Sequence, residues 1–115
     1  MGLDTFAART PRDEALSEED SHAFAGIELC GGMHSGAGGS FRGKVYGSLI
    51  ESVTGVSLYQ EWIEPEVVRE IAAALETCDA ERVAVEFDFS PVECEQLRRF
   101  FKVCGERGLG LAGWW

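Results

Sequence analysis

Residues 90–93, which read Ser-Pro-Val-Glu, constrain the fold more than any other stretch of the sequence. A Ser followed three residues later by Glu is a capping box, and Pro at the first helical position has the backbone angle that a helix start needs. Apolar residues then recur at helical spacing, so the sequence predicts a helix that ends at about Glu106. The residues expected on its buried stripe are Cys94, Leu97, Phe100, Phe101 and Cys104.

Two further helices are predicted upstream. Apolar residues in the segment 45–53 repeat at helical spacing, with Ser40 available as the N-cap and Gly55 placed where a helix C-terminus favours glycine. Another helix is expected to begin near Pro65, because acidic residues flank the proline and the apolar positions stay in phase to about Thr77.

Alternating side chains predict the strands. The clearest alternation covers residues 82–89, with valine and phenylalanine on one side and polar residues on the other, although a competing interpretation continues a helix through this segment. Glu86 and Asp88 then share the polar face, where they could flank a metal or a substrate or simply face solvent. Alternation also predicts strands at 23–30 and 109–115, and a short edge strand at 3–7.

These elements predict an α+β fold. Three helices and three or four strands give a two-layer domain, with about three helices packed on one face of a small three- or four-stranded sheet. The 115 residues suit a single domain spanning 1–115. Residues 12–20 are acidic around one apolar residue, Leu16, which predicts a solvated loop or a short surface helix and is consistent with mobility.

The formal net charge is −10, from twenty acidic and ten basic residues. Direct nucleic-acid binding needs clustered Lys and Arg and is therefore not expected. No apolar stretch approaches the ~20 residues of a membrane helix, and the start lacks a secretory-signal pattern, so a cytoplasmic protein without membrane contact is predicted. The four cysteines lack the paired spacing of a zinc ribbon and are expected to be free thiols, with no cofactor.

Half of the fourteen glycines fall between Gly26 and Gly43, and residues 31–43 are predicted to form a glycine-rich loop. Ordering such a loop costs entropy that a tight turn, a close backbone approach or a bound ligand would offset. Residues 38–44 match the G-x-x-x-x-G-K part of a phosphate-binding loop, although Val45 stands where a magnesium-binding Ser or Thr would follow. We therefore expect a small binding or protein-interaction module that recognises a small anionic ligand. Its candidate ligand-binding residues are His34, Ser35, Ser40, Arg42 and Lys44.

Two alternatives stay open beside this binding module. Cys30 and His34, four residues apart, would supply a nucleophile and a base in a small enzyme whose anionic substrate is positioned by Arg42 and Lys44. The same pair could instead be two ligands of a metal ion. The acidic residues 13–20 would instead suit an inhibitor that occupies the basic site of a nucleic-acid-binding protein. We favour binding without catalysis.

The sequence ends in Trp114 and Trp115, and tryptophan is enriched at protein interfaces. Adjacent residues of a strand point to opposite faces, so one tryptophan is expected in the core and the other outward or on a partner chain. The two are the candidate interface residues, and a homodimer is the partner that they suggest. Tyr59 and Trp62 could join them in an aromatic cluster that lines an interface or an apolar pocket, and we favour the interface.

Overall fold

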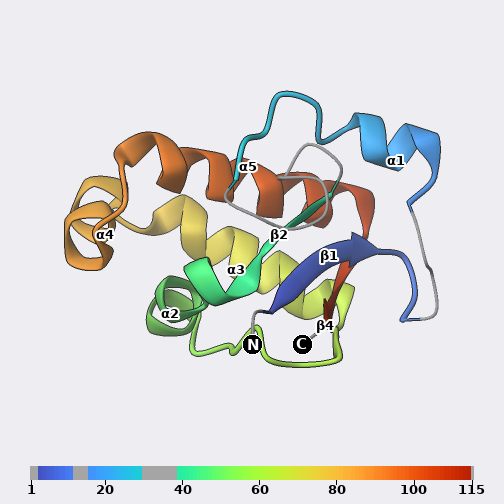
Figure 1. Cartoon of the computed structure of the whole chain (residues 1–115), viewed down its shortest axis with the longest axis horizontal. Coiled ribbons are helices and arrows are strands. Elements are labelled where there is room, and N and C mark those ends of the chain that lie inside the picture. Colours follow the sequence, from blue (N-terminus) through green and yellow to red (C-terminus); the bar gives the residue numbers. More distant parts are fainter. Residues whose placement is uncertain (1–2, 12–15, 30–38, 115) are drawn as a thin grey trace.

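The antiparallel sheet is built around two strands from opposite ends of the sequence. The computed structural model describes residues 3–11, 16–29 and 39–114. Its strands are β1 (Asp4–Ala8), β2 (Ser40–Arg42), β3 (Trp62–Ile63) and β4 (Gly110–Trp114), in the order β2-β1-β4-β3 with every neighbouring pair antiparallel (Figure 1). The final strand is confirmed. The N-terminal strand was expected at an edge, but β1 pairs on both sides and is therefore internal.

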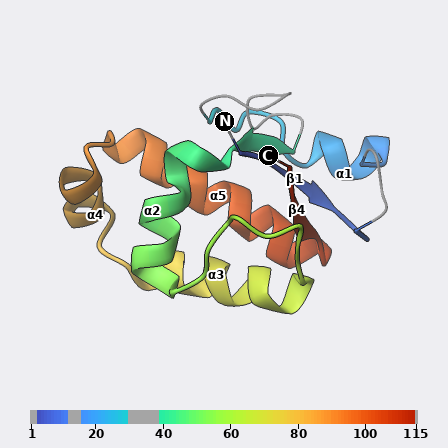
Figure 2. The same cartoon turned by 60° about the horizontal axis from the view of Figure 1, so that its bottom comes forward.

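The helices in the described part of the chain are α1 (Glu18–His22), α2 (Gly43–Thr54), α3 (Pro65–Thr77), α4 (Ala80–Phe87) and α5 (Pro91–Arg107). Of these, α2, α3 and α5 pack together against one face of the sheet, as the two-layer α+β class predicts (Figure 2). Ser90 caps α5 through its Oγ, which accepts a hydrogen bond of 3.1 Å from the Glu93 N–H. Gly55 and Gly108 adopt positive φ angles of 78° and 68° and end α2 and α5.

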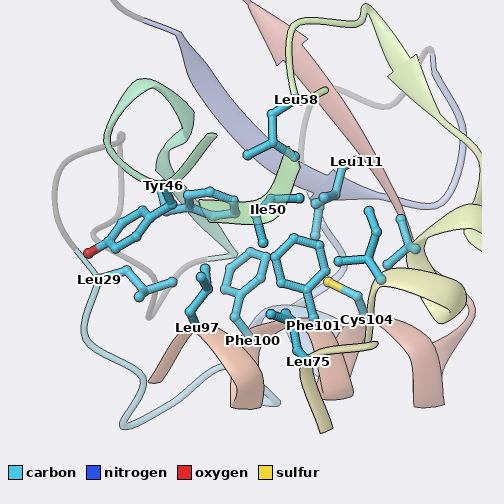
Figure 3. Close-up of a cluster of buried hydrophobic side chains, with 14 of the residues drawn as sticks. Leu29, Tyr46, Ile50, Leu58, Leu75, Leu97, Phe100, Phe101, Cys104 and Leu111 are labelled. Atoms are coloured by element: carbon cyan, nitrogen blue, oxygen red, sulfur yellow. The ribbon is translucent and has the colours of Figure 1, made fainter. Parts of the chain in front are cut away.

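Aromatic side chains from separate elements meet in the core between the helices and the sheet. The Phe100 ring centroid lies 4.8 Å from that of Phe24 and 4.9 Å from that of Phe41 in β2. Figure 3 shows Phe100 and Phe101 of α5 in one cluster with Tyr46 of α2. The prediction of the buried face of α5 is confirmed in part. Cys94 is only half-buried, while the other four residues are buried: Leu97, Phe100, Phe101 and Cys104.

The strand predicted over residues 82–89 was wrong, because this segment is the helix α4. The Asp79 carboxylate accepts hydrogen bonds from the backbone N–H groups of Glu81 and Arg82 and so caps the helix start. The apolar residues alternate in sequence, yet Val85 is 84% exposed and Ala84 is buried, as a helical face requires. Glu86 and Asp88 therefore do not share a strand face.

The strand predicted over residues 23–30 was also wrong for the residues that the structure describes, which end at 29. Consecutive turn hydrogen bonds run from the Phe24 N–H to the Ser21 carbonyl and from the Ile27 N–H to the Phe24 carbonyl. Phe24, Ile27 and Leu29 are buried while Ala25 is exposed, so burial does not follow the predicted alternation. No strand thus leads from this segment into residue 30.

Candidate functional site: the outer face of the sheet

The sheet has two chemically different faces. Successive side chains of a strand point to opposite sides, and Phe41, Ile63 and Leu111 belong to the core on the helix side. We call the opposite side the outer face. It is formed by the intervening residues of all four strands, chiefly Asp4, Phe6, Arg42, Trp62, Ala112 and Trp114.

The strand register brings these residues into adjacent rows. Asp4 of β1 lies opposite Arg42 of β2 on one side and opposite Trp114 of β4 on the other. In the next row, Ala112 lies between Phe6 and Trp62. Directly opposite residues of an antiparallel pair have Cβ atoms about 4.5–5.5 Å apart, so each row forms a continuous surface.

Aromatic side chains dominate the outer face. Trp114 is 67% exposed, while Phe6 and Trp62 are partly exposed. The Trp62 indole lies over the backbone of β4, because a Cβ added at Gly110 would come within 2.6 Å of two of its ring carbons. Glycine at position 110 thus leaves room for the indole of Trp62 beside the β4 backbone. Ser40 and Ala112 on the same face are buried, so the exposed apolar surface is centred on Trp114, and tryptophan is enriched at protein interfaces.

One corner of the outer face is charged. Arg42 and Asp4 are direct cross-strand neighbours of opposite charge beside Trp114. Lys44 follows in the first turn of α2, and both basic residues are exposed. The side chains of Arg42 and Lys44 form no hydrogen bond or ion pair with another residue in the described ranges, so their charges are available to a partner or a ligand.

The described part of the phosphate-loop match has a different local structure from the one expected. Ser40 lies in β2 and is buried, and the N-cap of α2 is Arg42, whose side chain makes no capping hydrogen bond. Strand passes directly into helix at Gly43, whose N–H donates a 2.8 Å hydrogen bond to the Leu3 carbonyl. A Cβ at position 43 would lie 2.7 Å from Leu3 Cδ2, so this glycine permits the start of α2 to contact β1.

Some of the predicted site residues lie outside the described ranges. These are Cys30, His34, Ser35 and Trp115. The anionic-ligand site and the enzymatic alternative therefore stay predictions. The structure does bring Arg42, from the predicted ligand site, onto the same face as Trp114, from the predicted interface.

A cluster of ion pairs surrounds Asp20 in α1. Arg9 Nε lies 2.7 Å from Oδ2 and the second Arg9 nitrogen 2.8 Å from Oδ1, while Arg107 Nε of α5 lies 2.9 Å from Oδ1. The hydrogen bonds from Arg9, followed by those from Arg107, lower the pKa of Asp20 to about 2 against the opposing effect of burial. Among the described acidic residues of 16–20, Asp20 is the most buried, and it links α1 to Arg9, which directly follows β1, and to α5.

Metal binding has little support in the described residues. They contain no group of three or more His, Cys, Asp or Glu side chains that could hold an ion. Cys104 is fully buried, and this burial raises the pKa of its thiol far above the usual range, so the thiol is chemically inert.

The sequence singles out Trp114 and Arg42 as candidates and offers Trp62 for an aromatic cluster, but it gives no indication of Asp4 or Phe6. These two join the outer face through pairings between strands far apart in the sequence, which no local pattern reports. One sequence signal for large neighbours was available in the segment 109–115. Its alternation places Gly110 and Ala112 on the same face as Trp114, and small residues there leave room for large side chains from the neighbouring strands.

Comparison with protein-family models, with curated proteins and with solved structures finds no match for this chain. Within the described ranges, none of the helices has the length and apolarity needed to cross a membrane.

Proposed function

We propose that this chain is a protein-interaction module that binds a second copy of itself through the outer face of the sheet. The proposal depends on the exposure of the Trp114 side chain, which is 67% exposed and has two further aromatic residues, Phe6 and Trp62, close to it on the same face. Tryptophan and arginine are enriched among the residues that contribute most to binding at protein interfaces. The cytoplasmic location expected from the sequence is part of the same proposal.

The charges on the outer face support a second copy as the partner. A two-fold axis passing between Asp4 and Arg42 would place each of these residues against its opposite in the other protomer. The outer face is therefore complementary in charge to a second copy of itself. The charges of Asp4 and Arg42 balance each other there, although the whole chain carries a net charge of −10. Repulsion between the two acidic protomers acts at longer range and is screened by salt.

The sheet edges are less suitable for association than its face. The edge strands β2 and β3 have three and two residues, which is too short to template an added strand. The fifteen strand residues, with a rise of about 3.4 Å per residue and a strand spacing of about 4.8 Å, give a face of roughly 250 Å². A standard interface buries about 800 Å² per partner, so we expect a weak dimer with a dissociation constant in the micromolar range or above.

Sedimentation velocity tests the proposal, with protein concentrations from low micromolar to millimolar. The wild type is expected to pass from monomer to dimer over this range, and the transition is expected to shift to lower concentration as salt is added. Trp114→Ala is expected to weaken dimerisation at least about tenfold, or about 1.4 kcal/mol, because each dimer buries two of these indoles.

Val85→Ala is the matched control for the loss of an exposed apolar side chain. Val85 is 84% exposed but lies on α4, away from the sheet, so dimerisation should not change. A wild type that stays monomeric throughout, or a dimer equally sensitive to both substitutions, would overturn the proposal.

The anionic ligand remains a second proposal for the same region, supported by the unpaired side chains of Arg42 and Lys44 in the described structure. Titration with inorganic phosphate, followed by the backbone NMR shifts of Lys44 and Val45, would test it. Shifts that saturate and disappear in Arg42→Gln would support a site. Shifts that grow linearly with concentration would count against one.

A further inference from the structure

Two cysteines meet at the end of the molecule opposite to α1. Cys78 is the C-cap residue of α3, and Cys94 is the fourth residue of α5. The helix α4 connects the C-terminal end of α3 to the N-terminal end of α5 (Figure 1). In the sequence, Cys78 therefore precedes α4 and Cys94 follows it.

Both cysteines border the same internal space. A cavity of about 10 Å³ is lined by Cys78 and Cys94 together with Leu75, Val83 and Leu97, and both cysteines are half-buried. This volume is at the lower limit for holding one water, and most of its lining is apolar. The two thiols thus border the same narrow, mostly apolar gap.

The pKa of the Cys94 thiol is consistent with a nearby Cys78 thiol. Burial is the main cause that raises the pKa of its thiol, and the Cys78 thiol is the next cause, because two thiolates would repel each other. The Cys78 Sγ donates a hydrogen bond of 3.2 Å to the Leu75 carbonyl, which holds the sulfur at the end of α3. Cys104 is ten residues from Cys94, or about 15 Å along the same helix, so it cannot pair with Cys94, and it does not line the cavity that the other two cysteines share.

We propose that Cys78 and Cys94 form an intramolecular disulfide when the protein meets a peroxide, so that the segment α3-α4-α5 is a thiol modification site. The sulfur of Cys78 attacks a peroxide oxygen, the O–O bond breaks, and a sulfenic acid and one water result. The sulfur of Cys94 then attacks the sulfenic sulfur, the S–O bond breaks, and a second water leaves as the S–S bond forms. Two thiols and one hydrogen peroxide thereby give one disulfide and two waters.

The assignment of roles follows from burial. A thiol with a raised pKa is a poor first nucleophile, so Cys94 serves as the resolving thiol. The bond would close a ring of seventeen residues around α4, from position 78 to position 94. Cross-linking a loop of this length restricts the unfolded chain, and the oxidised form is expected to melt roughly 10 °C above the reduced form.

Peptide mapping provides the test, because trypsin separates all four cysteines. Cys30, Cys78, Cys94 and Cys104 fall in different tryptic peptides, and cleavage after Arg82 divides the proposed pair. The folded protein is treated with hydrogen peroxide, its remaining thiols are alkylated, and it is digested without reductant. We expect a cross-linked species that contains peptides 70–82 and 83–98, has lost two hydrogens, and separates on reduction.

Matched variants decide whether the link is specific. Cys78→Ser and Cys94→Ser should each abolish the cross-link and the rise in melting temperature, while Cys30→Ser should leave both intact. Folding of the serine variants is checked by far-UV circular dichroism under reducing conditions. The proposal is overturned if Cys78 and Cys94 stay open to alkylation after peroxide treatment, or if the disulfide maps to Cys30.

Discussion

The ion pairs around Asp20 predict a pH-dependent stability of defined sign and size. The hydrogen bonds from Arg9 and Arg107 lower the pKa of Asp20 from 3.8 to about 2, which corresponds to about 2 kcal/mol of folding free energy. The Asp20 side chain is almost fully shielded, but Arg9 is 54% exposed, so solvent screens part of the interaction. We therefore expect a contribution of about 1–2 kcal/mol.

The sign follows from the direction in which the pKa moves. A carboxyl group whose pKa is lower in the folded state adds its stability in full above the unfolded value, and loses it as the pH falls toward the folded value. For Asp20 the loss should begin near pH 4 and continue toward pH 2. Urea unfolding at a series of pH values should show that Asp20→Asn lowers stability by about 1–2 kcal/mol at pH 7 and by progressively less below pH 4.

Glu19 supplies the matched control. Its carboxylate lies 3.5 Å from Arg107 but is 89% exposed, and an exposed pair of this kind contributes little. Glu19→Gln should therefore change the free energy of unfolding by less than about 0.5 kcal/mol at any pH. The reasoning fails if the two substitutions cost the same, or if the cost of Asp20→Asn does not change between pH 6 and pH 3.

Three further predictions concern stability and are measured by urea unfolding at pH 7. Gly43→Ala should lose about 1–3 kcal/mol, because its Cβ would press on Leu3, whereas Gly47→Ala in the same helix has open space and should gain about 0.5–1 kcal/mol. Ser90→Ala should lose about 1 kcal/mol with the cap of α5, and Ser90→Asn should restore most of it. Phe100→Ala should lose about 3–5 kcal/mol and Phe100→Leu clearly less, since Phe100 has no exposed surface. A Gly43→Ala protein as stable as the wild type, or equal losses for the two substitutions at Phe100, would contradict the packing described above.

The sequence predicts the helices best where their ends carry local signals. The Ser90 cap and the prolines at the starts of α3 and α5 act within one helical turn, so they favour a helix start whatever the helix later packs against. A strand was predicted in place of α4 because Val83, Val85 and Phe87 alternate with other residues. Two signals favoured a helix: Asp79 can cap its start, and the more buried residues Val83, Ala84 and Phe87 lie on one helical face. With eight residues, alternation and helical spacing are hard to distinguish.

The sheet and the site depend on contacts that local patterns do not report. The segment 23–29 has an alternating sequence, but its buried residues follow the shape of the core, where Phe24 packs on Phe100. The exposure of a terminal tryptophan could be predicted from its strand. The neighbours of Trp114 could not, because its opposite residue is Asp4, at the other end of the described chain.

The position of β4 between β1 and β3 has a consequence for the order in which the molecule is assembled during synthesis. Within the described residues, all five helices and the other three strands precede β4 in the sequence, yet both β1 and β3 pair with it. A nascent chain that has emerged only as far as α5 can bring its helices together, but β1 and β3 still lack their shared neighbour. Until β4 leaves the ribosome, the hydrogen-bonding edges of β1 and β3 stay unpaired and accessible to other chains, which is the period when this protein is most exposed to misassociation.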